Sequence, residues 1–319
     1  MKRIFIIGCL IGLSVPVLHA QEAPGFLDVY DSLTGTVSQI QVDPNLTSLQ
    51  GKAPEQQEKE ENEAVAASVL NGEDWYQVNG KKWPYSAVVH IKKDGAGRCS
   101  GAMIGPYTVL TNAHCVYKSI QHDKQFHNNG EMYQPSQLTA YAGGDSSSIH
   151  ARATRIYAAP GTARLDWGTE FMNKDYAILV LDKPIGNQSG YFGAKRVQFK
   201  QGTNIKIVGF PGVKNHRSPW VSPGKVSRVY SSRIEHSADV MAGNSGSPVF
   251  LGNDLENVVA VHSFGHDETN KPGNGATANK DLLSFIEKYR DEKPTGSPSK
   301  NGNTKQDVVN TLRNQFKHK

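Results

Sequence analysis

Short apolar runs recur through the middle of the chain, and most of them are rich in β-branched residues. They are separated by Gly, Pro, Asn and Asp. Frequent short strands with turn-forming residues between them are typical of an all-β barrel or sandwich. We therefore predict strands over the segments 86–91, 108–110, 177–181, 205–208, 248–250 and 258–261.

One later segment has a helical pattern instead. In residues 281–290 (DLLSFIEKYR) the apolar positions fall at spacings that place them on one face of an α-helix. These positions are Leu282, Leu283, Phe285, Ile286 and Tyr289. We expect an amphipathic helix that closes the domain.

The start of the chain has the pattern of an export signal. A basic beginning, Met1 to Arg3, is followed by an apolar run from Ile4 to Leu18 and by the small residue Ala20. This predicts a signal peptide over 1–20 and a secreted or periplasmic protein. A membrane anchor is the alternative, although the run is shorter than the roughly 20 residues that span a bilayer. We expect no membrane span in the mature form.

Residues 21–68 differ from the rest in composition. They contain nine acidic residues against Lys52 and Lys59, and they have little apolar periodicity. Such composition is typical of a disordered or loosely folded segment. We predict an acidic propeptide over 21–68 that covers a basic surface, with an inert linker as the alternative.

The length and net charge of the chain limit its domain organisation and the kinds of partner it requires. A chain of 319 residues fits one large two-part domain with appendages. We place the domain at 69–291, the boundary between its halves near 190–200, and a polar basic tail at 292–319. The net charge of +5 is mild, so it does not require a nucleic-acid or membrane partner.

Two cysteines, Cys99 and Cys115, remain once the signal peptide with Cys9 is removed. Exported proteins usually pair such cysteines. We predict a Cys99–Cys115 disulfide, with two buried free thiols as the alternative.

The strongest chemical motif is Gly-Asn-Ser-Gly-Ser-Pro at 243–248. A nucleophilic serine needs an exposed hydroxyl on a tight turn and backbone N–H groups aimed at the developing oxyanion. Flanking glycines allow that backbone shape. Ser245 is therefore the candidate nucleophile, although glycine-rich turns with serine are common.

Two further residues complete a possible triad. His114, in Thr-Asn-Ala-His-Cys at 111–115, follows a predicted strand and could act as a general base. Asp175 directly precedes another predicted strand, where it could orient the imidazole. Each residue alone has a structural explanation. The order His, Asp, Ser in an exported β-rich chain matches the chymotrypsin arrangement.

These motifs resemble the glutamyl endopeptidase branch of the chymotrypsin-like proteases. The resemblance runs from about Val69 to Tyr289 and includes the segments 83–89, 99–106 and 209–212 as well as the three motifs above. It implies an all-β fold of two six-stranded antiparallel β-barrels, followed by the C-terminal helix.

The resemblance also implies the layout of the site. His114 and Asp175 would come from the first barrel and Ser245 from the second, with the N–H groups of Gly243 and Ser245 forming the oxyanion hole. No metal or organic cofactor is implied. The expected partners are protein or peptide substrates and an activating protease, and the enzyme is expected to be a monomer.

Activation is expected at a site that resembles the new N-terminus of processed relatives. We predict cleavage between Ser68 and Val69. In animal relatives the freed amine pairs with an Asp directly before the nucleophile. This chain has Asn244 there, which carries no charge, so that ion pair cannot form.

The substrate specificity has to be inferred from a few residues near the nucleophile motif. His262 lies where glutamyl endopeptidases have a pocket histidine, and the resemblance places Ser263, Gly265 and the Val69 amine beside it, which favours cleavage after Glu or Asp. Two residues depart from the pattern: Val240, where the family usually has Thr or Ser, and Asp239, where trypsin-type enzymes bind Arg or Lys. Basic, small or apolar specificity therefore remains open, as does a purely structural role for His262.

A non-catalytic binding relative of the same fold is the alternative of a different class. Such proteins usually lose a triad residue or an oxyanion glycine. All of these residues are present here, which favours the enzyme.

Overall fold

The computed structural model describes residues 25–55, 74–122, 125–158, 173–264, 273–277 and 280–295. The predicted signal peptide, the cleavage site at Val69, Gly265 and most of the predicted tail lie outside these residues. In the part that is described, no helix is long and apolar enough to cross a membrane.

The first half of the domain is a closed six-stranded β-barrel. Its strand order is β10-β5-β6-β7-β12-β11, and β10 also pairs with β11 to close it. The central strand β12 is buried at all five positions, because it lies inside the sheet and carries only apolar side chains. The strands are β5 (Val88–Lys93), β6 (Ala96–Met103), β7 (Thr108–Thr111), β10 (Leu138–Ala142), β11 (His150–Ala158) and β12 (Ala177–Leu181).

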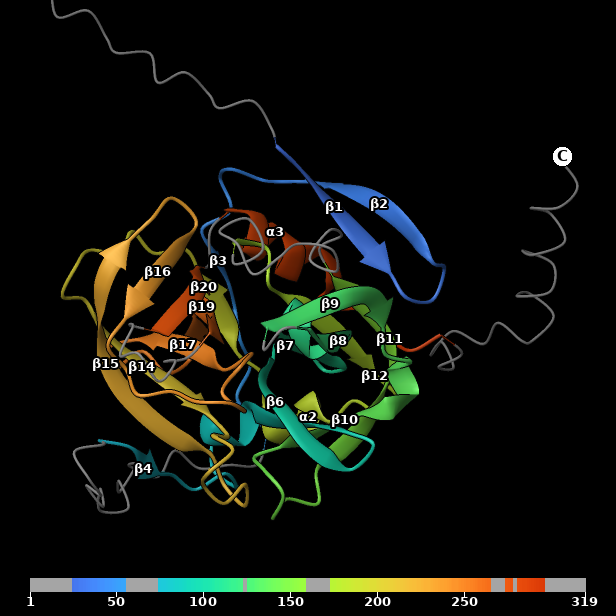
Figure 1. The fold of residues 1–319 in the computed structure, drawn as a ribbon. Coiled ribbons are helices and arrows are strands. Elements are labelled where there is room, and N and C mark those ends of the chain that lie inside the picture. Colours follow the sequence, from blue (N-terminus) through green and yellow to red (C-terminus); the bar gives the residue numbers. More distant parts are fainter. Residues whose placement is uncertain are drawn as a thin grey trace, which may run out of the picture.

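The second half is a second closed barrel, which stands beside the first (Figure 1). Its order is β14-β17-β19-β20-β16-β15, closed by β14–β15, with β4 (Tyr76–Gln77) added at the outer edge of β15. The barrel strands are β14 (Asn204–Gly209), β15 (Trp220–Val229), β16 (Arg233–His236), β17 (Pro248–Leu251), β19 (Ala260–Phe264) and β20 (Gly273–Thr277). The predicted all-β fold with two six-stranded barrels is confirmed.

Smaller elements connect and cover the barrels. A hairpin of β8 and β9 follows the short helix η2, and β13 and β18 form a small sheet with β3 (Ser48–Leu49). The bounds are η1 (Tyr85–Ala87), η2 (Ala113–Cys115), β8 (Tyr117–His122), β9 (Gln125–Met132), η3 (Pro135–Gln137), α2 (Gly186–Ser189), β13 (Gly193–Lys195) and β18 (Asn257–Val258).

The predicted C-terminal helix is present as α3 (Lys280–Tyr289). All five apolar positions that define its pattern are buried, and they belong to the same hydrophobic core as the first barrel. Tyr157 of β11 stacks on Tyr289, with 4.0 Å between the ring centroids. The helix therefore packs against the first barrel.

The leader is more ordered than its composition predicts. Residues 25–55 form β1 (Phe26–Asp31), β2 (Thr36–Gln41) and β3 (Ser48–Leu49). The strands β1 and β2 form a hairpin, and β1 adds to the edge of β11 in the first barrel. The expectation of a disordered segment is wrong for this part, because a few alternating apolar residues are enough to fasten a hairpin to an existing sheet.

A buried histidine lies where the two barrels meet. The His90 imidazole on β5 is 2% exposed, and its Nδ1 lies 2.7 Å from Oδ1 of Asp145. The His216 ring, from the β14–β15 connection of the second barrel, packs against it at 4.4 Å between centroids. The Asp145 main-chain N–H donates to the His216 carbonyl across the same junction at 2.8 Å.

The pKa of His90 is lowered to about 4: burial is the main cause, the His216 ring and the charge of Lys92 act in the same direction, and Asp145 opposes them. The free energy of unfolding is therefore expected to fall as the pH drops from about 6.5 to about 4, because only the unfolded chain binds the proton there. The expected loss is about 3 kcal/mol. Urea unfolding of the Ser245→Ala chain at pH 7 and pH 4.5 measures it.

The control variants are His90→Gln, which should flatten this pH dependence, and His150→Gln at an exposed site, which should leave it unchanged. An unaltered slope in His90→Gln would show that another group governs acid stability.

Candidate active site

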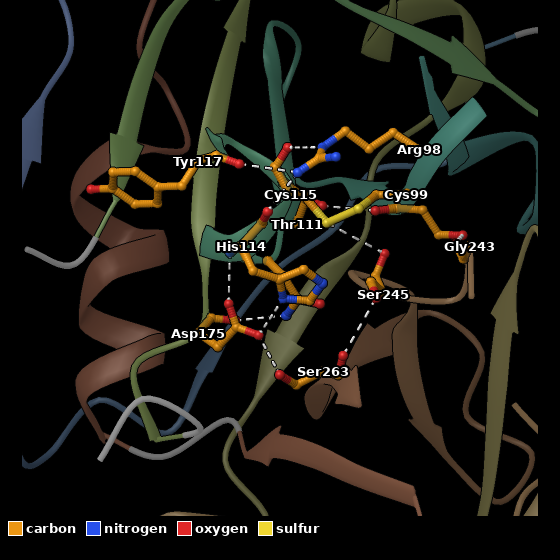
Figure 2. The surroundings of a disulfide bond; sticks show 12 residues. Arg98, Cys99, Thr111, His114, Cys115, Tyr117, Asp175, Gly243, Ser245 and Ser263 are labelled. Atoms are coloured by element: carbon orange, nitrogen blue, oxygen red, sulfur yellow. Dashed lines mark hydrogen bonds and ion pairs between the residues drawn. A yellow bond between two sulfur atoms is a disulfide. The ribbon is translucent and has the colours of Figure 1, made fainter. Parts of the chain in front are cut away.

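The histidine of the predicted triad lies on η2, directly after β7. The loop is held on both sides: the Cys99–Cys115 disulfide ties it to β6, with a Cα–Cα distance of 6.2 Å. This confirms the predicted disulfide. The Asn112 side chain also donates to the Asp175 carbonyl oxygen at 2.6 Å. These contacts fix the main chain around His114 (Figure 2).

Arg98 provides a further support. Its guanidinium donates to the carbonyl oxygens of Cys115 at 2.6 Å, His114 at 2.9 Å and Tyr117 at 3.1 Å. Because η2 is too short to satisfy its own carbonyls, the bonds to His114 and Cys115 supply missing donors. Sequence reasoning did not identify Arg98, since nothing in its neighbourhood distinguishes it from a surface cation.

The acid lies opposite the histidine. Asp175 is fully buried and precedes β12. Its Oδ1 accepts the His114 main-chain N–H at 2.9 Å, and its Oδ2 lies 2.7 Å from His114 Nδ1. The Ser263 hydroxyl donates to Oδ2 as well. These hydrogen bonds hold the buried carboxylate so that it faces one edge of the imidazole.

The candidate nucleophile lies on a glycine-flanked turn before β17. The Ser245 hydroxyl lies 3.4 Å from the carbonyl oxygen of Ser263, and the Ser245 carbonyl accepts the Ser100 N–H at 2.8 Å. Gly246 has φ +85°, and a Cβ there would meet the Ser100 carbonyl oxygen at 2.2 Å. Only glycine fits this close approach. In Figure 2 the His114 ring is drawn between Asp175 and Ser245.

The peptide between Ala242 and Gly243, which precedes the candidate nucleophile, has a defined direction. The Ala242 carbonyl accepts the Gly212 N–H at 2.7 Å, and the Gly243 carbonyl accepts the Ser100 hydroxyl at 2.8 Å. In a trans peptide the C=O and N–H groups point to opposite sides. The Gly243 N–H therefore points away from Gly212. Its φ of +101° is available to glycine without strain.

The structure places two of the residues predicted to bind substrate close to the glycine-flanked turn. His262 and Ser263 lie on β19 beside the candidate nucleophile Ser245: the Gly246 N–H donates to the His262 carbonyl at 2.8 Å, and the His262 N–H donates to the Ser247 carbonyl at 2.9 Å. The Ser263 hydroxyl is directed to Asp175, a contact that sequence reasoning did not identify.

The His262 imidazole is buried and paired. Its Nδ1 lies 3.2 Å from Nε2 of His236, which is also buried. His236 was not singled out in the sequence, because its position on β16 gives no indication that it meets β19. The two rings form a connected pair inside the second barrel.

The two residues that depart from the family pattern before Ser245 have different surroundings. Val240 packs in the hydrophobic core of the second barrel. Asp239 is partly exposed. Burial raises the pKa of Asp74, and the Asp239 carboxylate raises it further. Asp239 therefore lies close enough to Asp74 for their charges to interact.

The fold and this arrangement of residues define a serine endopeptidase of the chymotrypsin class. The family model described as Trypsin matches residues 74–286, so the chain belongs to the trypsin family. The predicted activity class is thereby confirmed.

Within this family, the chain belongs to the glutamyl endopeptidase branch. It is 32% identical to the glutamyl endopeptidase of Bacillus licheniformis over 274 residues, which cover 78% of this chain and 82% of the relative. It is 26% identical to the glutamyl endopeptidase of Staphylococcus epidermidis, covering 71% of this chain and 76% of the relative. A solved structure of a Glu endopeptidase in complex with MPD superposes with a TM-score of 0.57 at 28% identity, covering 70% of this chain and 99% of the other.

Proposed function

We propose that His114, Asp175 and Ser245 hydrolyse peptide bonds through an acyl-enzyme. Ser245 attacks the scissile carbonyl, and His114 takes the hydroxyl proton and later gives it to the leaving amine. Asp175 holds the imidazole in the tautomer with a proton on Nδ1 and stabilises the imidazolium that forms. The contact of His114 Nδ1 with Oδ2 of buried Asp175 is the observation that carries this assignment.

The N–H groups of Gly243 and Ser245 would form the oxyanion hole. The direction of the Gly243 N–H supports this assignment, since the Ala242 carbonyl is held by Gly212. Preorganised donors of this kind stabilise the tetrahedral intermediate because they need no reorientation during the reaction.

The substrate preference we propose is cleavage after Glu, and also after Asp. The connected pair of His262 and His236 supports it, because two adjacent imidazoles can take up one proton together and share the positive charge. A cationic imidazole near Ser245 would form a charge-assisted hydrogen bond with a substrate carboxylate. The similarity to glutamyl endopeptidases points in the same direction.

Replacement of His262 by glutamine is expected to lower kcat/KM for peptides with Glu at the cleavage site by roughly 10- to 100-fold, the range of a charge-assisted hydrogen bond. Peptides with Gln at that position should change much less, because they need no positive charge. Kinetics on a matched Glu and Gln peptide pair measures the ratio.

Labelling by a serine-directed phosphonate shows whether the variant keeps its active site, and His150→Gln serves as the matched control. If the unaltered enzyme prefers Arg or Lys, and Asp239→Asn removes that preference, the pocket is built on Asp239 and the acidic specificity is wrong.

The enzyme is further proposed to be exported by a signal peptide at 1–20 and made as a zymogen with a propeptide at 21–68. Cleavage by an activating protease would release Val69 as the new N-terminus of a domain that extends to 291. Sequencing of the N-terminus of secreted enzyme tests both sites.

A further inference from the structure

The leader strap, which we define as residues 25–55, makes contacts typical of an integral part of a fold. Its strand β1 continues the sheet of the first barrel, with Tyr30 opposite Ala158 and Asp31 opposite Tyr157. Figure 1 shows the hairpin β1–β2 lying alongside β11, and the chain then continuing past α3 toward β3. The family match begins only at Asp74, so the leader strap lies outside the matched domain.

Apolar side chains anchor the hairpin. Four residues of the leader strap are almost fully buried, and they share one hydrophobic core with α3 and the first barrel. They are Leu27, Val29, Ile40 and Val42. By contrast, Val37 on β2 is 55% exposed. The alternation along the hairpin therefore directs one face into the core and the other to solvent.

An ion pair fastens the end of β1. Asp31 is 8% exposed and accepts two hydrogen bonds from Arg155 of β11, at 2.9 Å from Nε and 2.6 Å from Nη2. Such a two-point contact between a guanidinium and a carboxylate is both strong and directional. Burial alone would raise the pKa of Asp31, but its hydrogen bonds and the charge of Arg155 hold the pKa below its ordinary value.

The second part of the leader strap binds α3 and the segment between the barrels. The Asp43 N–H donates to the Ser284 hydroxyl at 3.0 Å, and Arg196 donates to the Pro44 carbonyl at 2.7 Å. Strand β3 pairs with β13, with Leu49 opposite Ala194.

Main-chain contacts continue to the end of the leader strap. Lys52 and Tyr191 exchange two backbone hydrogen bonds of 2.8 Å, and Arg290 donates to the Gln50 carbonyl at 2.7 Å. A Cβ on Gly51 would lie 2.3 Å from the Gly193 nitrogen, so the two chains approach as closely as glycine allows. The leader strap thus bridges the first barrel, the C-terminal helix and the connection to the second barrel.

These contacts are made at β11, α3 and β13, whereas the proposed triad lies on η2, before β12 and before β17. Among the residues that the structure describes, the contacts of the leader strap named above do not involve the proposed triad, so use of the active site does not require them to break. We propose that residues 25–55 remain bound after cleavage at Ser68–Val69, so that the mature enzyme consists of two non-covalently associated polypeptides. This proposal depends on the proposed function in one respect only, because that function places the natural cut between the two polypeptides at Ser68–Val69.

The test uses the full chain with Ser245→Ala, which prevents self-digestion, and with a recognition sequence for a sequence-specific protease in place of residues 57–63. After cleavage, the two fragments are expected to co-elute in native size-exclusion chromatography and to separate only in denaturant, with intact masses confirming a one-to-one ratio. Elution of the leader fragment by itself would overturn the proposal. Because the cut is engineered, the result does not depend on natural processing at Val69.

Two variants of the hairpin make the test specific. Val29→Asp places a charge in the buried face and is expected to release the leader fragment after cleavage. Val37→Asp, on the exposed face of the same hairpin, is expected to retain it. If Val29→Asp does not fold, Asp31→Asn is tested in its place. It is expected to raise the dissociation rate of the leader fragment at least tenfold. Retention in both buried-site variants would contradict the assigned contacts.

Hydrogen exchange on the uncut chain gives an independent measurement. The amides of β1 that pair with β2 and β11 are expected to exchange as slowly as those of α3. Exchange at the rate of an exposed peptide would overturn the proposal even if the engineered site resists cleavage.

Discussion

Replacement of Ser245 by alanine is expected to reduce kcat by about 10⁶-fold, which is the scale on which serine proteases depend on their nucleophile. Without the hydroxyl no acyl-enzyme can form, and only the oxyanion donors and substrate binding remain to assist direct attack by water. Initial rates on a peptide with Glu at the cleavage site measure the effect, together with labelling by a serine-directed phosphonate, which should be lost completely.

The same substitution is expected to leave the stability of the fold almost unchanged. The Ser245 hydroxyl makes only a long contact with the Ser263 carbonyl, whereas the turn is held by main-chain bonds of Ser245 and Gly246 that alanine preserves. Ser231→Ala, at an exposed turn between β15 and β16, is the matched control and should retain full activity. Ser245-independent hydrolysis in pure enzyme would contradict the assignment of the nucleophile.

The strands that carry the triad could be predicted from sequence, but their neighbours could not. The segments 108–110 and 177–181 were predicted from apolar residues alone, and β7 and β12 occupy them. Their pairing, which sets Thr111 opposite Ala177, is what places His114 beside Asp175. Because pairing depends on the closure of the whole barrel, local patterns do not contain it, and only the resemblance to a known family supplied it.

The order of the leader strap was missed because composition was averaged over residues 21–68. Five of the nine acidic residues lie at 55–63 and weigh on that average, while the alternation of Leu27 and Val29 spans one short strand. A strand of six residues is stable only when an existing sheet edge and an apolar surface receive it. The edge of β11 and the side of α3 provide these, and neither is visible in the sequence of the leader itself.

The contacts that support the site also could not be predicted from the sequence. Arg98 reaches three carbonyls of the histidine loop, and the Ser263 hydroxyl, expected in the substrate cleft, is bonded to Asp175. The His236–His262 pair joins two strands that are not neighbours in the chain. In each case the decisive quantity is the direction of a side chain in the folded barrel, which a linear motif does not specify.

Replacement of Asp175 by asparagine is expected to lower kcat/KM by about 10⁴-fold while the fold is retained. Asp175 accepts hydrogen bonds from the His114 main-chain N–H, from the Nδ1 side of its imidazole and from the Ser263 hydroxyl. Asparagine has the same shape but only one acceptor oxygen. If its NH₂ group faces Nδ1, the imidazole must carry its proton on Nε2, and it can no longer accept the proton of Ser245.

The measurement compares kcat/KM and the rate of phosphonate labelling in Asp175→Asn and in Asp182→Asn, an exposed position just after the opposite end of β12. Both rates should fall together in the first variant, because acylation and labelling both need the base that takes the proton of Ser245, and both should stay within about twofold of the unaltered enzyme in the second. A loss smaller than tenfold in Asp175→Asn would mean that the tautomer of His114 is set by another group. The buried carboxylate would then serve the stability of the first barrel instead of the chemistry.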